Sequence, residues 1–301
     1  MSTPHYPVMN KEVIELFRDT GRECFIDCTL GMGGHTALLL EHFPGARVIA
    51  VDTDDKSIEK AKANIEAYCK TKHIDYIDRI EFHNINFTRL FDTVNLSGRR
   101  VSGILIDPGL SVDQLKSPER GFSHSIDAPL DMRKDTRQEL TAHTVINTYK
   151  EKELVNIFET FGEIARAREL AKKIIETRLF TAIDTTRQFA EIIEKFYRWR
   201  PKPGKTHPAA NVFQALRIVI NKELEGIGEF IRQIPQVLDK GARVAFLTFH
   251  SVEDRLVKRT FLELKKEAKL KIIKPFPAFP TEAEIAENLP SRSAKLRAGE
   301  V

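Results

Sequence analysis

The sequence has few of the residues that build disulfide-rich, metal-binding or membrane-spanning proteins. Its 301 residues include only Cys24, Cys28 and Cys69, too few for a disulfide framework and without a second Cys/His cluster at zinc-like spacing. No apolar run approaches the roughly 20 residues that span a bilayer. The amino-terminal stretch also lacks the basic and apolar regions of a secretory signal. We therefore expect a cytoplasmic protein without membrane association or a metal site, with Cys24 and Cys28 in or beside a buried strand.

Neither sign of charge dominates the chain. Lys and Arg number 47 and Asp and Glu 43, a net charge of +4 that is compatible with a polyanionic partner without requiring one. Residues 195–205 differ, because they contain no acid. Five cations there alternate with three aromatic rings: Lys195, Arg198, Arg200, Lys202 and Lys205 with Phe196, Tyr197 and the only tryptophan, Trp199. Such a segment suits RNA phosphates and bases, although a helix end with core rings and solvated charges has the same composition.

The first third of the chain alternates apolar runs with amphipathic helical patterns. Strands are expected at 23–28, 46–52, 79–87 and 101–107, and helices follow the first two of them. This βαβαβ order predicts an α/β fold with a parallel, doubly wound sheet.

After Asp107 the alternation stops, and helical runs separated by loops continue to about residue 207. A long helix at 211–238, a strand at 242–250 and a further short strand at 270–275 then restore the sheet pattern. The simplest organisation is one discontinuous α/β domain, 1–111 with 208–301, interrupted by a helical insertion at 112–207.

Ligands of open parallel sheets bind beyond the carboxyl ends of the strands. The expected strand ends carry Asp27 followed by a glycine turn, then Asp52, Phe87 and Asp107. A glycine turn with an acid about 20 residues later is also found in NAD-dependent dehydrogenases. Asp107-Pro108 favours a methyltransferase over a dehydrogenase, because it resembles the start of the Asp-Pro-Pro-Tyr motif of amino-methyltransferases. The alternative interpretation is that Asp52 caps a helix and Asp107 caps a loop.

Six blocks are similar to the MraW family of ribosomal RNA small-subunit methyltransferases, in the family's order and over essentially the whole chain. They are HYPVM (5–9), DCTLGMGGHT (27–36), SPERGFSHSIDAPLDMR (117–133), HPAANVFQALRIVIN (207–221), FHSVEDRLVKR (249–259) and SRSAKLR (291–297). The resemblance implies a class I, Rossmann-like methyltransferase sheet whose helical insertion recognises the substrate. It also implies transfer of a methyl group from S-adenosylmethionine to N4 of one cytidine in the decoding region of small-subunit (16S) rRNA.

The resemblance also implies the residues of the cofactor site. Carried over position by position, they are Gly33, Gly34, His35, Asp52, Phe87, Asp107 and Gln114. The chain departs from the family after the fourth strand, where Asp-Leu-Gly-Val-Ser-Ser is replaced by residues 107–112, Asp-Pro-Gly-Leu-Ser-Val. Pro108 removes a backbone N–H and Val112 removes a hydroxyl, which puts in doubt any role of those two groups in holding the target base.

Three residues are candidates for catalysis. Asp107 is the first choice as acceptor of the target amine, with Asp131 and His250 as further candidates. His250 could instead have a structural hydrogen-bonding role, and Asp131 could pair with Arg133 to order a loop. The predicted RNA contacts are Lys195, Arg198, Trp199, Arg200, Lys202 and Arg133. The partner is then small-subunit rRNA or the assembled small subunit.

The pattern leaves other functions and the oligomeric state open. The rival functions are an NAD-dependent oxidoreductase, a non-catalytic RNA-binding or assembly factor, and a DNA amino-methyltransferase. A homodimer is among the possible assemblies.

Overall fold

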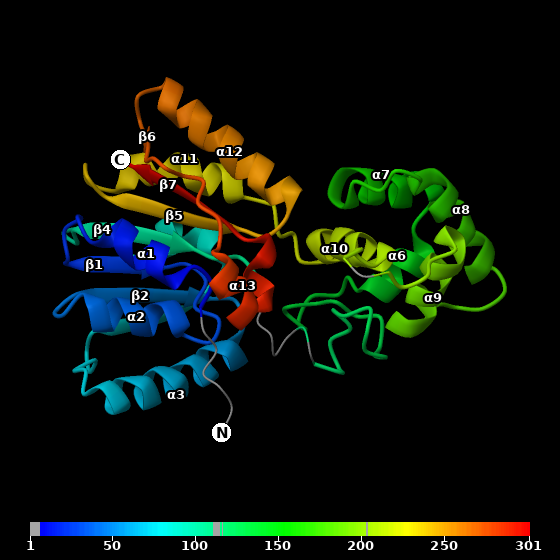
Figure 1. The fold of residues 1–301 in the computed structure, drawn as a ribbon, viewed down its shortest axis with the longest axis horizontal. Coiled ribbons are helices and arrows are strands. Elements are labelled where there is room, and N and C mark those ends of the chain that lie inside the picture. Colours follow the sequence, from blue (N-terminus) through cyan, green and yellow to red (C-terminus); the bar gives the residue numbers. More distant parts are fainter. Residues whose placement is uncertain (1–6, 111–114, 116, 203) are drawn as a thin grey trace. The chain divides into compact units, whose positions relative to one another are not determined.

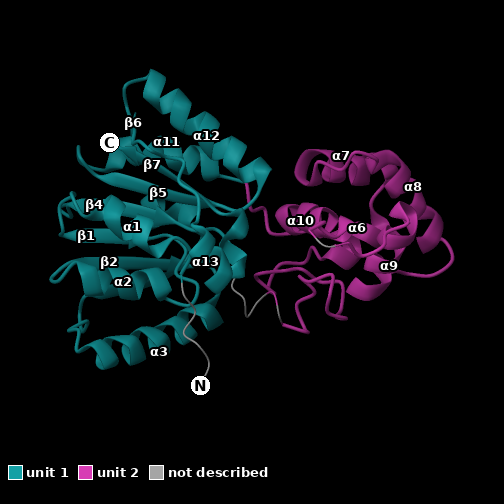
Figure 2. Cartoon of the chain, viewed as in Figure 1, with its two compact units in different colours: residues 1–109, 225–301 teal, residues 110–224 magenta. Residues whose placement is uncertain are grey.

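A computed structural model describes residues 7–110, 115, 117–202 and 204–301. The chain divides into two compact units, drawn in two colours in Figure 2. Unit 1 comprises residues 1–109 and 225–301, and unit 2 comprises residues 110–224. No helix in the described ranges is long and apolar enough to cross a membrane.

Unit 1 is built on a single sheet. Its strands are β1 (Cys24–Asp27), β2 (Arg47–Asp52), β3 (Ile80–Asn84), β4 (Val101–Ile106), β5 (Arg243–Thr248), β6 (Lys271–Ile272) and β7 (Lys295–Glu300), and their order across the sheet is β3-β2-β1-β4-β5-β7-β6. Strands β1 to β5 pair in parallel, whereas β7 is antiparallel to both β5 and β6. In Figure 1 the strands of this sheet run side by side across the picture, from β2 up to β5, with α1 and α2 in front of them. The predicted α/β fold with a parallel, doubly wound sheet is confirmed, and β7 adds an antiparallel strand.

Helices cover both faces of the sheet, so its central strands are apolar on both sides. All residues of β1 and β4 are buried. Helices α1 (Asn10–Phe17), α2 (Gly34–His42) and α3 (Asp55–Lys72) share one hydrophobic core with the sheet. Helices α11 (Ile227–Val237) and α12 (Ser251–Lys266) pack against each other outside that core. The short elements are η1 (Phe87–Arg89), α4 (Leu90–Thr93), α13 (Glu282–Glu287) and η2 (Leu289–Ser293).

All three cysteines are buried in unit 1 as free thiols. Burial raises the pKa of the Cys24 thiol to about 11, and it raises the pKa of Cys28 as well. Both therefore stay protonated and act as small apolar residues, as the sequence predicts.

Unit 2 has a helical core of its own. Its helices are α6 (Ala142–Thr148), α7 (Glu151–Gly162), α8 (Ala167–Arg178), α9 (Thr186–Tyr197) and α10 (Pro208–Ile220). Before α6 the chain runs through a long loop whose only regular pairing among the described residues is a bridge between Pro129 and Thr185. In this loop Gly121 has a φ of +66°, and a Cβ there would lie 2.2 Å from the Pro129 carbonyl oxygen, so only glycine fits.

The second boundary and one helix differ from the prediction. Residues 208–224 belong to unit 2 instead of the sheet domain, because α10 packs against α7 and α9. The expected long helix at 211–238 is two helices, α10 and α11. Between them Lys222 and Gly226 have φ values of +50° and +78°, which an α-helix does not allow.

Candidate functional site

Three aspartates end three adjacent strands of the sheet. Asp52 closes β2, Asp27 closes β1 and Asp107 directly follows β4, and these strands are neighbours in the order β2-β1-β4. Because parallel strands end at the same edge of a sheet, the carboxylates gather there, where ligands of such sheets bind.

The glycine turn after β1 needs its glycines. Gly31 and Gly33 have φ values of +52° and +83°. A Cβ on Gly33 would also lie 2.8 Å from Cγ1 of Ile65, and one on Gly34 would lie 3.2 Å from Pro7. The turn therefore packs between α3 and the amino-terminal segment. His35, which follows it, lies in the first turn of α2.

Asp52 ties this turn to the end of β2. Its Oδ2 accepts the Gly31 amide at 2.8 Å, and its Oδ1 accepts the Asp54 amide at 3.0 Å. The N-cap of α3 is Asp54, which accepts from the Lys56 amide. A carboxylate at this strand end is the type of group that accepts hydrogen bonds from ribose hydroxyls.

Asp27 is the fully buried centre of a polar cluster below this edge. Its carboxylate accepts the Thr36 hydroxyl at 2.7 Å and the Thr29 amide at 3.2 Å, and the Thr29 hydroxyl accepts the Asp107 amide at 2.7 Å. Burial raises the pKa of Asp27, against the opposing influence of His35 and of these hydrogen bonds. The cluster fixes the backbone of Asp107. Thr29 and Thr36 were not predicted from the sequence, although both lie in the block DCTLGMGGHT.

His35 and Asp107 face each other in this cluster. The His35 Nε2 lies 3.5 Å from the Asp107 Oδ2, beyond normal hydrogen-bond length. His35 is 7% exposed. Neither its Nε2 nor the Asp107 Oδ1 finds a hydrogen-bond partner among the described residues. A buried polar atom without a partner costs about 1–3 kcal/mol, so both atoms call for a partner that the described residues do not supply.

The remaining residues of the predicted cofactor set lie at this edge or outside the described ranges. Phe87 begins η1 just after β3, and its ring packs edge-on against Phe230 of α11 at 5.2 Å between centroids. Gln114, like Val112, is not among the residues that the structure describes.

His250 also lies near the strand ends, as the N-cap of α12. Its Nδ1 accepts the Glu253 amide at 3.3 Å, and the Glu253 carboxylate accepts the Phe249 amide at 2.9 Å. With Nδ1 used as an acceptor, the neutral ring carries its proton on Nε2. In this arrangement His250 can donate a hydrogen bond, and it cannot act as a base through Nε2.

Asp131 and Arg133 lie in the long loop of unit 2 and bind each other. The Arg133 Nε and Nη2 donate to the two Asp131 oxygens at 2.9 and 2.7 Å. The Arg133 Nη1 donates to the carbonyls of Thr136 and Gln138. Burial acts to raise the pKa of Asp131, but the hydrogen bonds from Arg133 outweigh it and the net shift is downward. The pair orders the loop.

The basic-aromatic segment, residues 195–205 without the undescribed 203, comprises the last three residues of α9 and the chain that follows it. Arg198 has a φ of +51° and ends the helix. Trp199 packs edge-on against His207 at 5.5 Å, and the Arg166 guanidinium lies 4.5 Å from the Phe196 ring centre. The cations Lys195, Arg198, Arg200, Lys202 and Lys205 are exposed. The rings therefore help to fix a surface that presents charge to solvent.

Sequence comparisons identify the family. The model of the MraW methylase family matches residues 2–301. The chain belongs to this family. A relative from Sulfurihydrogenibium sp., named ribosomal RNA small subunit methyltransferase H, is 40% identical over 296 residues, covering 98% of both chains. A relative of the same name from Synechococcus elongatus is 39% identical over 298 residues, covering 98% of this chain and 94% of its own.

One solved structure is remotely similar to this MraW family member. An rRNA methylase from Streptococcus thermophilus has 12% identity and a TM-score of 0.38, covering 97% of this chain and 92% of its own. At this level the likeness adds nothing to the assignment, which rests on the sequence matches.

The strand-end residues fit the cofactor of this S-adenosylmethionine-dependent methyltransferase family. A positive-φ glycine turn allows close approach of a ligand to the backbone, and Asp52 provides acceptors for ribose hydroxyls. The unpaired Asp107 Oδ1 and His35 Nε2 supply polar contacts that the described residues do not satisfy. Among those residues no cluster of His, Cys, Asp and Glu is arranged to hold a metal ion.

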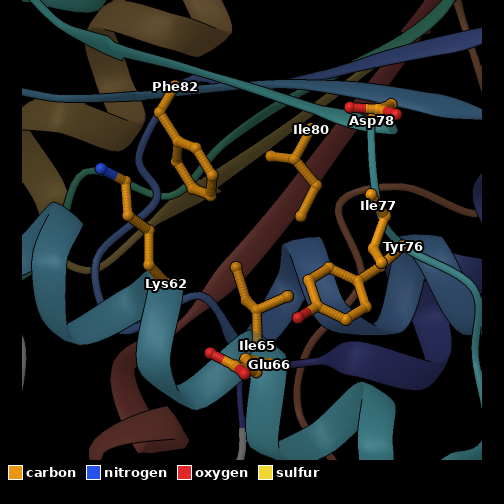
Figure 3. A pocket seen from close by; sticks show the side chains of 8 residues that line it. All are labelled: Lys62, Ile65, Glu66, Tyr76, Ile77, Asp78, Ile80 and Phe82. Carbon is orange, nitrogen blue, oxygen red and sulfur yellow. The ribbon is translucent and has the colours of Figure 1, made fainter.

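A separate pocket opens where α3 passes over the edge strand β3. Figure 3 shows the apolar side chains of Ile65, Ile80 and Phe82 turned toward the same space. The full lining is Lys62, Ile65, Glu66, Tyr76, Ile77, Asp78, Ile80 and Phe82. None of the predicted site residues lines this pocket, and we assign it no ligand.

Proposed function

We propose that this MraW family member methylates N4 of a specific cytidine in the decoding region of small-subunit (16S) rRNA. The relatives' name supports small-subunit rRNA as the substrate. The observation that carries the choice of an exocyclic amine is Asp107, a carboxylate at the end of β4 whose buried Oδ1 has no partner among the described residues.

The chemistry of the target explains why such a carboxylate is needed. The N4 amine of cytosine is a poor nucleophile because its lone pair is delocalised into the ring. Bound S-adenosylmethionine supplies an electrophilic methyl group on a sulfonium. The protein must then hold the amine in line and accept a hydrogen bond from it as positive charge develops, which is electrostatic and positional catalysis. In this proposal Asp107 accepts that hydrogen bond.

The two units divide the work in this proposal. Unit 1 binds the cofactor through Gly33, Gly34, His35, Asp52 and Phe87, with Gln114 as a further contact. Unit 2 binds the RNA through Lys195, Arg198, Trp199, Arg200 and Lys202. Because a base inside folded RNA is not accessible, the target cytidine must be splayed out or flipped before reaction. The substrate is the rRNA itself or the assembled small subunit.

The experiment is transfer of a labelled methyl group to small ribosomal subunits that lack the modification, followed by nucleoside mass spectrometry. Label in N4-methylcytidine at one site is the expected result. Label in another nucleoside would refute the N4 assignment. Cofactor binding without transfer to subunits or to naked rRNA would refute the proposed activity, and no cofactor binding would favour a non-catalytic assembly factor. Duplex DNA serves as the control for a DNA amino-methyltransferase.

A further inference from the structure

The imidazole of His35 lies among carboxylates from three different elements. Asp27 comes from β1, Asp107 follows β4 and Glu284 belongs to α13. The Asp107 Oδ2 is 3.5 Å from the His35 Nε2, and both Asp27 and Glu284 interact electrostatically with the ring. Glu284 also accepts the Met9 amide at 2.6 Å, so the carboxyl-terminal helix is fastened to the segment before α1 beside this ring.

The geometry distinguishes the two oxygens of Asp107. Oδ2 is the oxygen that lies 3.5 Å from the His35 Nε2, whereas the buried Oδ1 has no hydrogen-bond partner among the described residues. The Asp107 amide is already held by Thr29, so the backbone is fixed and the remaining freedom is rotation of the carboxylate. A hydrogen-bond donor to Oδ2 would stop this rotation of the Asp107 carboxylate. Hydrogen bonds of active sites are often long without substrate and shorten in the reactive complex.

We propose that His35 is a positioning residue for Asp107: its Nε2–H holds Oδ2 so that Oδ1 is presented to the target amine. This inference rests on the proposed function, because it assigns His35 a task in the reaction of Asp107. It differs from a cofactor contact, since the ring acts on the carboxylate and affects turnover more than cofactor affinity.

The test uses the full-length protein with substitutions at His35 and Asp107. His35→Leu removes the donor, and His35→Gln retains an amide N–H on a chain of similar length. The matched control is His42→Leu. It removes an exposed imidazole from the last residue of α2, at the opposite end of the helix from His35. Thermal unfolding is measured for every variant, and S-adenosylmethionine affinity by equilibrium dialysis.

His35→Leu is expected to lower kcat for total label transfer by about 100-fold, as a misplaced catalytic group does. Because His35 also belongs to the proposed cofactor set, the Kd for S-adenosylmethionine is expected to rise, but by much less than kcat falls. His35→Gln should recover most of the loss, and His42→Leu should behave as the wild type. In a double-mutant cycle, His35→Leu combined with Asp107→Ala should be no slower than Asp107→Ala alone, because nothing remains to be positioned.

Additive losses in that cycle would overturn the inference. So would a fall in cofactor affinity that accounts for the lost activity, or failure of His35→Gln to recover kcat while it remains folded. The identity of the methylated nucleoside is determined separately. A product other than N4-methylcytidine would refute the proposed function, and the cycle on total label would still test whether His35 acts through Asp107.

Discussion

Asp254 and Arg297 join the start of α12 to the middle of β7 through two hydrogen bonds. The Arg297 Nε donates to Oδ1 at 2.7 Å and Nη2 donates to Oδ2 at 3.1 Å. Lys295 adds a third contact at 3.1 Å, and Asp254 is 9% exposed. The blocks FHSVEDR and SRSAKLR, far apart in the sequence, therefore meet as a buried ionic clamp that holds β7 in the sheet.

Breaking this clamp should destabilise unit 1. Removing one partner of a buried ion pair leaves the other charge uncompensated, which costs several kcal/mol. We expect Asp254→Asn to lower the free energy of unfolding by about 3 kcal/mol at pH 7. The control is Asp19→Asn, an exposed aspartate 3.8 Å from Arg243, which should cost less than about 1 kcal/mol. Urea unfolding followed by circular dichroism measures both, and equal values would show that the clamp is dispensable.

The same clamp gives a pH dependence. Burial raises the pKa of Asp254, but hydrogen bonds from Arg297 and Lys295 outweigh it, so the folded-state pKa is below the ordinary value. A carboxylate with a lowered pKa adds stability above its unfolded pKa of about 3.9, and this is lost as the pH falls toward the folded-state value. The wild type should therefore lose more stability than Asp254→Asn between about pH 5 and pH 3. The free energy of unfolding is measured against pH for both proteins. If the two curves run parallel, the Asp254 carboxylate does not cause the loss of stability in acid.

Two glycines with nearly the same positive φ allow the effect of backbone strain to be distinguished from an effect on ligand binding. Gly33 and Gly45 have φ values of +83° and +84°, but only at Gly33 would a Cβ meet other atoms, 2.8 Å from Ile65. Gly45→Ala should cost about 1 kcal/mol for the left-handed backbone alone. Gly33→Ala should cost more and also reduce S-adenosylmethionine affinity. Equal affinities of the two variants in equilibrium dialysis would remove the turn from the cofactor site.

The sequence predicts the parallel part of the sheet well because each strand is a short apolar run with a polar end. The register that places Asp27, Asp52 and Asp107 side by side follows from that pattern alone. β7 is not predicted, because KLRAGE combines charges and a glycine in a strand with only alternate apolar residues. It is stabilised by the long-range clamp from Asp254, which no local pattern reveals.

Side-chain partners are also poorly predicted from the sequence. The sequence leaves Arg133 open between an RNA contact and a partner of Asp131, and the structure shows the second, with the guanidinium bound by Asp131 and by two carbonyl groups of its own loop. The break between α10 and α11 is hidden because helical periodicity continues through it. Only the positive φ values at Lys222 and Gly226 end the first helix.

The basic-aromatic segment should control the salt dependence of RNA binding. We expect replacement of Lys195, Arg198, Arg200 and Lys202 by Gln to weaken binding. The slope of log K against log salt should fall by about 3, since each lost contact to a single strand removes about 0.7. Replacing Lys258, Lys265, Lys266 and Lys269 in unit 1 is the charge-matched control. Filter binding at several salt concentrations measures both slopes. An unchanged slope in the first variant would make the segment an ordinary solvated surface.

Trp199 provides a direct optical probe of the same segment because it is the chain's only tryptophan. If a base stacks on its ring, RNA binding should quench the intrinsic fluorescence. Trp199→Ala should lose about 1–3 kcal/mol of binding energy, whereas Trp199→Phe should retain most of it. The variant in which Gln replaces the four cations is also titrated to the same RNA saturation. If its Trp199 fluorescence is quenched as fully as in the wild type, stacking does not depend on those charges. No change in emission on binding would exclude stacking.

Asp107 should be essential for turnover and dispensable for folding. Its Oδ1 has no partner among the described residues. Its backbone amide, which the substitution retains, donates to the Thr29 hydroxyl. Asp107→Ala therefore removes little stabilising interaction but deprives the amine of its acceptor. Loss of one such group costs about 100- to 1000-fold in kcat. Single-turnover transfer at saturating cofactor measures this loss, with thermal unfolding as the check on folding. A folded Asp107→Ala with near wild-type turnover would remove this carboxylate from the mechanism and, with it, the structural support for the choice of an exocyclic amine.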